Sequence, residues 1–298
     1  MENNQLRQLN NNVEVIGTLI SKELEIKTST ANKNYITGKL VVQTKIGNRF
    51  HEQNIKVFVM ESSKFYRGVL TVMNEYRELD RIKVTGTLKL CEYNNNQGNI
   101  ASFNEIRGMY FTRLKVNDQP DKALASIETI VESYTPKLSV DGSPTGDYYV
   151  KGFTVGYQDE IIELKNVIIG SNIYTPFQNL YFPGTTGRLI YQLNNCVEQS
   201  ETTQQNHGFG DTSLSVSSNT NKNYVSFMEI VAGDTPFIDA KAYNPTEIST
   251  AKQLRAKQLD GVKNKNNSSS ISTKGTGFSS LTTATPGVNL ADGSMPDF

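Results

Sequence analysis

Residues 78–114 carry the most regular alternation of apolar and polar positions in the chain. In the first half of this segment, apolar residues or glycine and polar or basic residues take opposite parities: Ile82, Val84, Gly86, Leu88 and Leu90 against Lys83, Thr85, Thr87 and Lys89. A turn-rich stretch, Asn94–Asn99, then precedes a second extended run. Alternation with a period of two on both sides of a turn predicts a β-hairpin with one apolar face and one basic face.

The sequence before this hairpin predicts three strands and a helix. Apolar residues alternate in the strand regions and recur at helical spacing in the next region, so the expected elements are strands over residues 13–19, 35–46 and 49–60 and a helix over residues 64–76. Three strands, a helix and two strands is the order of an OB fold, a five-stranded Greek-key barrel. Residues 11–116 are therefore expected to form an OB-fold domain, and the fold class is expected to be mainly β.

The next region has the composition of a linker. Residues 117–146 contain Pro120, Pro136 and Pro144, and such residues end regular structure. Apolar residues at helical spacing within Lys122–Tyr134 predict one short helix inside this linker.

Residues 147–260 predict a second β-rich domain. Strands are expected over residues 148–155, 160–170, 188–197 and 224–231, and a helix capped by Thr246 over residues 246–259. A second β-barrel accounts for this pattern, and whether it has OB order stays open. Residues 172–186 form an expected aromatic loop, which we interpret as structural because no Lys or Arg lies between Lys165 and Arg188.

The last segment, residues 261–298, is rich in Asn, Ser, Thr and Gly. Such a composition buries too little apolar surface to offset the entropy of ordering, so this tail is expected to be disordered. Its tip differs in character, because it combines acidic and aromatic residues with the terminal carboxylate: Asp292, Pro296, Asp297 and Phe298.

Charge is distributed unevenly along the 298 residues, although the formal net charge is zero. Residues 1–117 hold 17 Lys/Arg and 11 Asp/Glu (+6), residues 118–260 hold 10 and 17 (−7), and residues 261–298 hold 3 and 2 (+1). A basic first block favours contact with a polyanion through that block. An ordinary solvated surface can carry the same excess of charge, so this signal does not decide between the two.

The chain shows no secretory or membrane signal. Its first residues have no basic region followed by an apolar stretch, and no apolar run approaches the roughly 20 residues of a membrane helix. The two cysteines, Cys91 and Cys196, are far apart in the sequence. A reducing cytoplasm is therefore the expected location.

Several of these features together resemble a known family. The strand Asp80–Leu88 has the form DxIxVxGxL, the strand Val13–Leu19 contains a glycine before its terminal leucine, and a long hairpin, Tyr93–Leu114, follows. With the tail and its Pro and Phe tip, this resembles the single-stranded DNA-binding proteins of bacteria and their phages. The resemblance covers residues 11–116 and the tip, and it leaves the middle of the chain unmatched.

The resemblance implies a divergent phage-type protein that binds single-stranded DNA with little sequence preference. Its expected role is to protect the strand during DNA replication, recombination or repair in the host cytoplasm. It also implies that the tail tip docks replication or recombination proteins, or competes with DNA for the basic face. A homo-oligomer stays open, and no membrane partner is expected.

The residues of the first block suggest which side chains would bind the strand. Lys and Arg neutralise phosphates, and aromatic rings stack on bases at about 1–3 kcal/mol per base. The candidates are basic and aromatic residues expected to point outward or to lie at strand ends and on the hairpin: Tyr35, Lys39, Lys45, Arg49, Lys56, Phe58, Lys83, Lys89, Tyr93 and Phe103. Each could instead pack against the helix or the second block.

Two other classes of protein are weighed against a strand binder. The chain contains no GxSxG, HExxH, P-loop or GxGxxG motif, and neither His51 nor His207 has metal ligands at a suitable spacing. No catalytic activity, metal or cofactor is therefore expected. The remaining alternative is a virion structural or assembly protein whose β-barrels make protein contacts, which would need no continuous basic groove.

Overall fold

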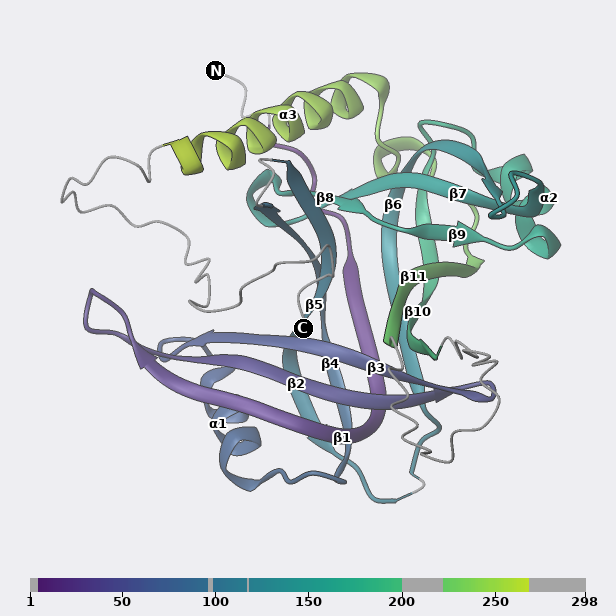
Figure 1. Cartoon of the computed structure of the whole chain (residues 1–298). Helices are drawn as coiled ribbons and strands as arrows, with labels where there is room; N and C mark the ends of the chain where they lie inside the picture. The colour runs from purple at the N-terminus through teal and green to yellow at the C-terminus, as the bar shows by residue number, and fades with distance from the viewer. Residues whose placement is uncertain (1–4, 96–98, 117, 200–221, 268–298) are drawn as a thin grey trace, which may run out of the picture.

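The computed structural model describes residues 5–95, 99–116, 118–199 and 222–267. The fold is mainly β and consists of two barrels side by side, with the helix α3 lying across one end (Figure 1). The expected disordered tail, residues 261–298, lies outside the described residues from residue 268 onward. No helix in the described part of the chain is long and apolar enough to cross a membrane.

The first barrel has the predicted order of elements. It consists of β1 (Asn11–Thr28), β2 (Asn34–Ile46), β3 (Arg49–Met60), α1 (Tyr66–Glu75), β4 (Arg81–Asn94) and β5 (Ile100–Arg113). The strands pair in the cycle β1–β2–β3–β5–β4–β1, in which only β3 and β5 run parallel. The closed five-stranded barrel and the long β4–β5 hairpin are therefore confirmed.

The alternating pattern explains why this barrel closes. Its apolar parity points inward on every strand, as the buried Ile36, Ile55 and Ile82 show, and the other parity faces solvent or neighbouring elements. The helix α1 places Val69 and Val72 on the same core. Burial of one face of each strand then fixes the register, because a slip of one residue would turn the apolar side chains outward.

The second barrel repeats this architecture. It consists of β6 (Lys122–Leu138), β7 (Pro144–Val155), β8 (Ile161–Leu164), β9 (Val167–Ile169), α2 (Ser171–Leu180), β10 (Thr186–Gln199) and β11 (Lys222–Gly233). The pairing cycle is β6–β7–β9–β11–β10–β6, with only β9 and β11 parallel. In chain order a helix again lies between the third and fourth of the five strands in this cycle, β9 and β10, so the second barrel has OB order.

Three expected elements of the second half were wrong. The short helix in the linker is the strand β6, because Ala123, Ala125 and Ile127 alternate into the core while β1 and β10 satisfy its two edges. The single strand over residues 160–170 is split by Asn166, whose φ is 52°. The aromatic loop contains the helix α2, which buries an aromatic side chain in the second barrel, as the structural interpretation required.

The boundary between the two halves also differs from the expected one. Because β6 pairs with β7 and β10, the second barrel begins at Lys122, and residue 147 lies inside β7. A division of the chain into independently folding domains stays a prediction.

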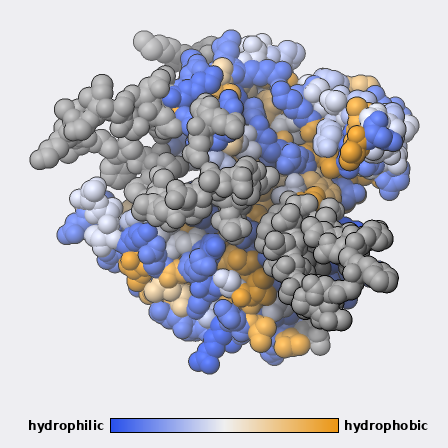
Figure 2. All heavy atoms as spheres, viewed as in Figure 1, coloured by the Kyte–Doolittle hydropathy of each residue, from blue (hydrophilic) through white to orange (hydrophobic). Residues whose placement is uncertain are grey.

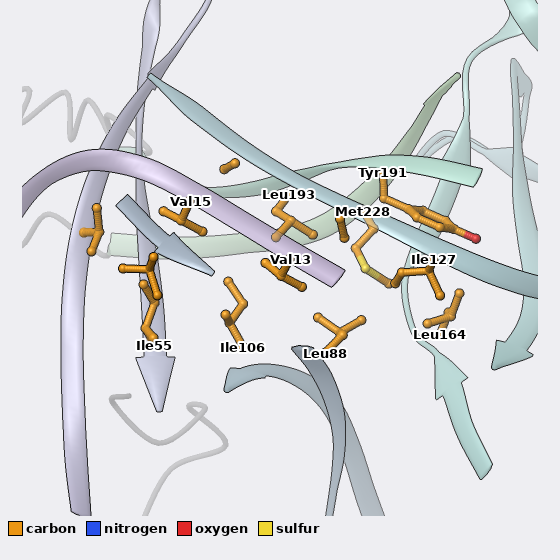
Figure 3. Close-up of a cluster of buried hydrophobic side chains, with 14 of the residues drawn as sticks. Val13, Val15, Ile55, Leu88, Ile106, Ile127, Leu164, Tyr191, Leu193 and Met228 are labelled. Atoms are coloured by element: carbon orange, nitrogen blue, oxygen red, sulfur yellow. The ribbon is translucent and has the colours of Figure 1, made fainter. Parts of the chain in front are cut away.

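The two barrels join through their first strands. Antiparallel pairing of β1 with β6 makes one continuous 11-stranded sheet. One cluster of buried side chains runs across this junction, with Val13 of β1, Leu88 of β4, Ile127 of β6 and Leu193 of β10 among its members (Figure 3).

Two short 3-10 turns complete the fold: η1 (Tyr157–Asp159) between β7 and β8, and η2 (Asp239–Lys241) after β11. The C-terminal helix α3 (Pro245–Asn267) follows η2. The expected cap Thr246 was wrong. Asn244 caps the helix, because its Oδ1 accepts the Glu247 N–H at 2.9 Å and Glu247 Oε2 accepts the Asn244 N–H at 2.8 Å. This reciprocal pair is a capping box, and Pro245 occupies the first helical position, where its missing N–H costs nothing.

Candidate nucleic-acid interface

Three cationic side chains form a row across the first barrel. Lys39 of β2 lies directly opposite Lys56 of β3, and Lys56 is in turn the parallel partner of Arg107 of β5. Paired residues point to the same face of a sheet, and neighbouring strands are about 4.8 Å apart. The three charges therefore cross the outer face of the barrel within about 10 Å.

The row is only partly neutralised by carboxylates. Lys39 lies 3.5 Å from Glu23, and Arg107 lies 2.9 Å from Glu105. Within the described ranges, Lys56 is exposed and forms no ion pair. The carboxylate of Glu23 is 64% exposed, and exposed ion pairs contribute about 0–1 kcal/mol, so a phosphate group can displace it from Lys39 at little cost.

An aromatic ring lies next to the row. Phe58, two residues beyond Lys56 on the same face of β3, is 37% exposed. Its ring centroid is 5.3 Å from that of Tyr35. Tyr35 shares the outer face with Phe58, because its partner Met60 is two residues from Phe58 on β3, but it is only 6% exposed and therefore has no ring face free for stacking. It lies at the start of β2, which pairs there with both β1 and β3, and its ring packs against the ring of Phe58.

A second group of residues lies where β2 and β3 meet. Lys45 and Phe50 are opposite one another, Arg49 is adjacent, and all three are exposed, with Phe50 at 59%. Sequence reasoning missed Phe50 and Arg107. The parity of β3 could have identified Phe50, since it shares the outward face with Lys56 and Phe58, whereas Arg107 becomes visible only through the β3–β5 pairing.

Two predicted lysines of β4 are neutralised by ion pairs near the junction of the barrels. Lys83 is 2.5 Å from Glu14, which also contacts Lys122 at 2.6 Å at the junction of β1, β4 and β6. Burial raises the pKa of Glu14, but hydrogen bonds from Lys122 and Lys83 outweigh it and lower the pKa overall. Lys89 pairs with Glu160 of the second barrel. Both lysines therefore stabilise the junction between the barrels.

The last two candidates lie further along the β4–β5 hairpin. Tyr93 is 40% exposed, and its ring centroid is 6.3 Å from that of Phe103 in an edge-to-face arrangement. Phe103 lies opposite Cys91, on the same parity of β5 as Arg107. These rings therefore continue the outer face of the row towards the hairpin tip.

The titratable groups beside the row have no reactive character. Burial, with Glu105 next in importance, raises the pKa of the Cys91 thiol to about 12. His51 points inward, and its Nδ1 accepts the Asn195 N–H at 3.2 Å; burial and the nearby Arg49 lower its pKa. Over the described ranges, no three His, Cys, Asp or Glu side chains gather in a metal-binding arrangement.

The surface around these residues mixes the two kinds of side chain. Figure 2 shows hydrophobic residues among hydrophilic ones over the first barrel, in the lower part of the view. The tail residues Asp292, Pro296, Asp297 and Phe298, predicted to bind partners, lie outside the described residues.

Comparison with known proteins gives one family and several similar structures. The family model described as YorF matches residues 10–265. No curated protein sequence matches the chain. The wild-type single-stranded DNA binding protein from Thermus aquaticus is similar, with a TM-score of 0.49 and 12% identity over 80% of this chain and 99% of that chain.

Two smaller structures are also similar. Mitochondrial Rim1 of S. cerevisiae has a TM-score of 0.29 and 16% identity, over 37% of this chain and 98% of that chain. The Plasmodium falciparum SSB complex with ssDNA has a TM-score of 0.28 and 18% identity, over 37% and 98%. At these scores and identities, the likenesses assign no function to this chain.

Proposed function

The chain belongs to the YorF family, whose description names no activity, and we propose from its own geometry that it binds single-stranded DNA along the first barrel. The strand would lie across the outer face of β2, β3 and β5. The row of Lys39, Lys56 and Arg107 would contact its phosphates, and Phe58 would stack on a base.

The observation that carries this proposal is the alignment of three cations with an adjacent exposed ring on one barrel face. Phosphates need positive charge that follows the backbone, and bases need a flat apolar partner, since every base has a π-face. Lys45, Arg49 and Phe50 repeat the same combination at the end of β2 and β3. Contacts of this kind distinguish one base poorly from another, so the binding has little sequence preference.

The biological role proposed is protection of exposed single strands during DNA replication, recombination or repair, in a phage-encoded protein that works in the host cytoplasm. The tail tip would dock replication or recombination proteins or compete with the strand for the basic face. The polar tail followed by Phe298 and the terminal carboxylate supports this part of the proposal. The protein acts by binding and performs no chemical step.

Fluorescence titration with poly(dT) at several salt concentrations tests the binding. Lys56→Ala should weaken binding and make the slope of log K against log salt smaller by about 0.7, the value for one phosphate contact to a single strand. Phe58→Ala should cost about 1–3 kcal/mol of binding free energy while the salt slope stays unchanged.

Lys257→Ala is the matched control, because this lysine is exposed on α3 and forms no ion pair within the described residues. It should bind poly(dT) as the wild type does. Absence of binding at low salt in the wild type would refute the proposal and favour a structural role in a virion. Equal losses for Lys56→Ala and Lys257→Ala would show that only overall charge matters.

A further inference from the structure

The two barrels can be superimposed position by position through their irregularities. The first strand of each has a bulge at a corresponding point, between Leu19 and Ser21 in β1 and between Val131 and Ser133 in β6, and β6 has a second irregularity between Pro136 and Leu138. In the second strands, the residues opposite these bulges are Val41 and Lys151. Since side chains alternate with a period of two, this match assigns residues 148–155 of β7 equivalents in residues 38–45 of β2.

The three positions of the second barrel that correspond to Lys39, Lys56 and Arg107 carry no cation. Counting from the bulges, Lys39 corresponds to Tyr149. Tyr149 pairs with Ile168 of β9, as Lys39 pairs with Lys56.

The third position follows from the parallel strands. Ile168 pairs with Glu229 of β11, as Lys56 pairs with Arg107. The last hairpins support this match. Arg107 pairs with Thr87 and Glu229 pairs with Gln192, and in each hairpin a bulge follows the residue two positions earlier, Thr85 in β4 and Ile190 in β10. The row Tyr149–Ile168–Glu229 therefore has a carboxylate where the first barrel has a guanidinium group.

The positions next to the row also lose their cations between the first barrel and the second. Val155 and Ile161 are opposite one another in β7 and β8, as Lys45 and Phe50 are in β2 and β3. One extra residue lies between β8 and β9, so the match at this end follows the pairing with β7, in which Glu160 precedes Ile161 as Arg49 precedes Phe50. Gly170, next after β9, takes the place of Phe58. Five cationic positions of the first barrel thus hold no cation in the second, and two of them hold glutamates.

Part of the second face is also covered by the chain itself. Val155 and Ile161 are buried beneath Leu6 of the N-terminal segment, Tyr243 of the loop between η2 and α3, and Ala251 of α3. The corresponding pair in the first barrel, Lys45 and Phe50, is exposed. A strand therefore has no access to this end of the second barrel.

We propose that each chain holds a single strand-binding face, on the first barrel, and that the matching face of the second barrel excludes the strand by its lack of cations at these positions, by the carboxylate of Glu229 and by its α3 cover, whereas Glu160 is already paired with Lys89. This inference rests on the proposed function and adds the stoichiometry and the path of the strand. The second barrel then serves as a support that completes the junction at β1 and β6. The occluded length is that of one OB fold, which ranges from about 4 to 16 nucleotides.

Paired variants of the full chain test the inference by oligo(dT) titration at low salt. Lys39→Ala with Lys56→Ala should lower affinity at least tenfold. Tyr149→Ala with Lys151→Ala removes the most exposed ring and cation from the second face, at 43% and 67% exposure, and should leave affinity within twofold of the wild type. Circular dichroism should show that both variants are folded.

The outcomes separate the two proposals. A tenfold loss in both variants would leave strand binding in place and overturn the single-face inference. No loss in the first variant would overturn the proposed function and the inference together, whatever the second variant does. As an independent measurement, an oligo(dT) of about 10 nucleotides, within the range for one OB fold, should saturate at one molecule per chain; saturation at two would overturn the inference alone.

Discussion

Arg255 of α3 is the side chain whose replacement should most disturb the joint between helix and barrels. Its guanidinium group donates to both carboxylate oxygens of Glu92 on β4, through Nη1 at 2.8 Å and also through Nη2. It also lies 3.2 Å from Glu163 on β8. The side chains of Arg255 and Glu92 are 8% and 9% exposed. One buried cation thus holds a hairpin of the first barrel, a strand of the second and the helix together.

Replacement by methionine, Arg255→Met, retains an unbranched apolar stem and removes the charged guanidinium group. Loss of one partner from a buried ion pair costs about 3–5 kcal/mol, because the remaining carboxylate is buried without compensation. Glu163 keeps its ion pair with Lys165 at 2.5 Å, whereas Glu92 loses the cation with which it pairs. We therefore expect a cost of about 3 kcal/mol in the free energy of unfolding. At about 2–4 °C per kcal/mol, Tm should fall by about 6–12 °C.

The pH dependence gives this prediction a second, independent readout. Burial raises the pKa of Glu163, but hydrogen bonds from Arg255 and Lys165 outweigh it and lower the pKa. A lowered carboxyl pKa contributes stability above the unfolded value, 4.5, that is lost as pH falls through the folded pKa. Without Arg255 this contribution shrinks. The difference between wild type and variant should therefore be largest near pH 7 and smaller below about pH 4.5.

Urea unfolding followed by circular dichroism at pH 7 and pH 4 measures both quantities. Lys257→Met, on the exposed side of the same helix, is the control and should change stability by less than about 0.5 kcal/mol. A loss below about 1 kcal/mol for Arg255→Met would place the pair among exposed ion pairs and refute the reasoning. A loss that is the same at both pH values would show that packing, and not charge, is responsible.

Three other predictions concern the first barrel. The Cys91 thiol, with its pKa of about 12, should react with a disulfide reagent at pH 8 far more slowly than a free thiol does, and rapid reaction would contradict its burial. The pKa of His51 is lowered in the folded state, so as pH falls the unfolded chain takes up this proton first. Urea unfolding should therefore show stability decreasing below about pH 6.5. His51→Leu should flatten this dependence. Gly17→Ala should destabilise the barrel by about 1–3 kcal/mol, because its Cβ would lie 2.2 Å from a main-chain oxygen of β2. Gly68→Ala in α1 meets nothing within 4 Å and should not destabilise in the same assay; a loss as large as that of Gly17→Ala would contradict the steric explanation.

The elements of the first barrel could be predicted because their signals are local. The expected strand over residues 49–60 coincides with β3, and the expected hairpin coincides with β4 and β5. In β3 and β4 one face is buried, which leaves an alternation in the sequence, whereas β2 buries Leu40, Val41 and Val42 in succession. In β6 the residues from Ile127 to Val131 are all buried, so alternation fails and the apolar spacing looked helical.

The candidate site could be predicted only in part, because charge pairing depends on distant residues. Lys56 and Phe58 lie on the expected outer face of β3. Lys89 has the same sequence signal, yet its partner Glu160 is 71 residues away in the chain. Arg107 is adjacent to Lys56 only because β5 returns parallel to β3. No local pattern contains these relations.

The sequence by itself determined which face of each strand in the first barrel is apolar, the order of its elements and the basic character of its outer surface. The apolar face follows from the period of two along a strand, and the helix and the charges are likewise visible in short segments of the sequence. The tertiary structure decided that the chain contains the barrel order twice, and that Tyr149, Ile168 and Glu229 occupy the positions of Lys39, Lys56 and Arg107. Register between strands depends on closure of the whole barrel, so this difference between the two faces appears only once both barrels are assembled.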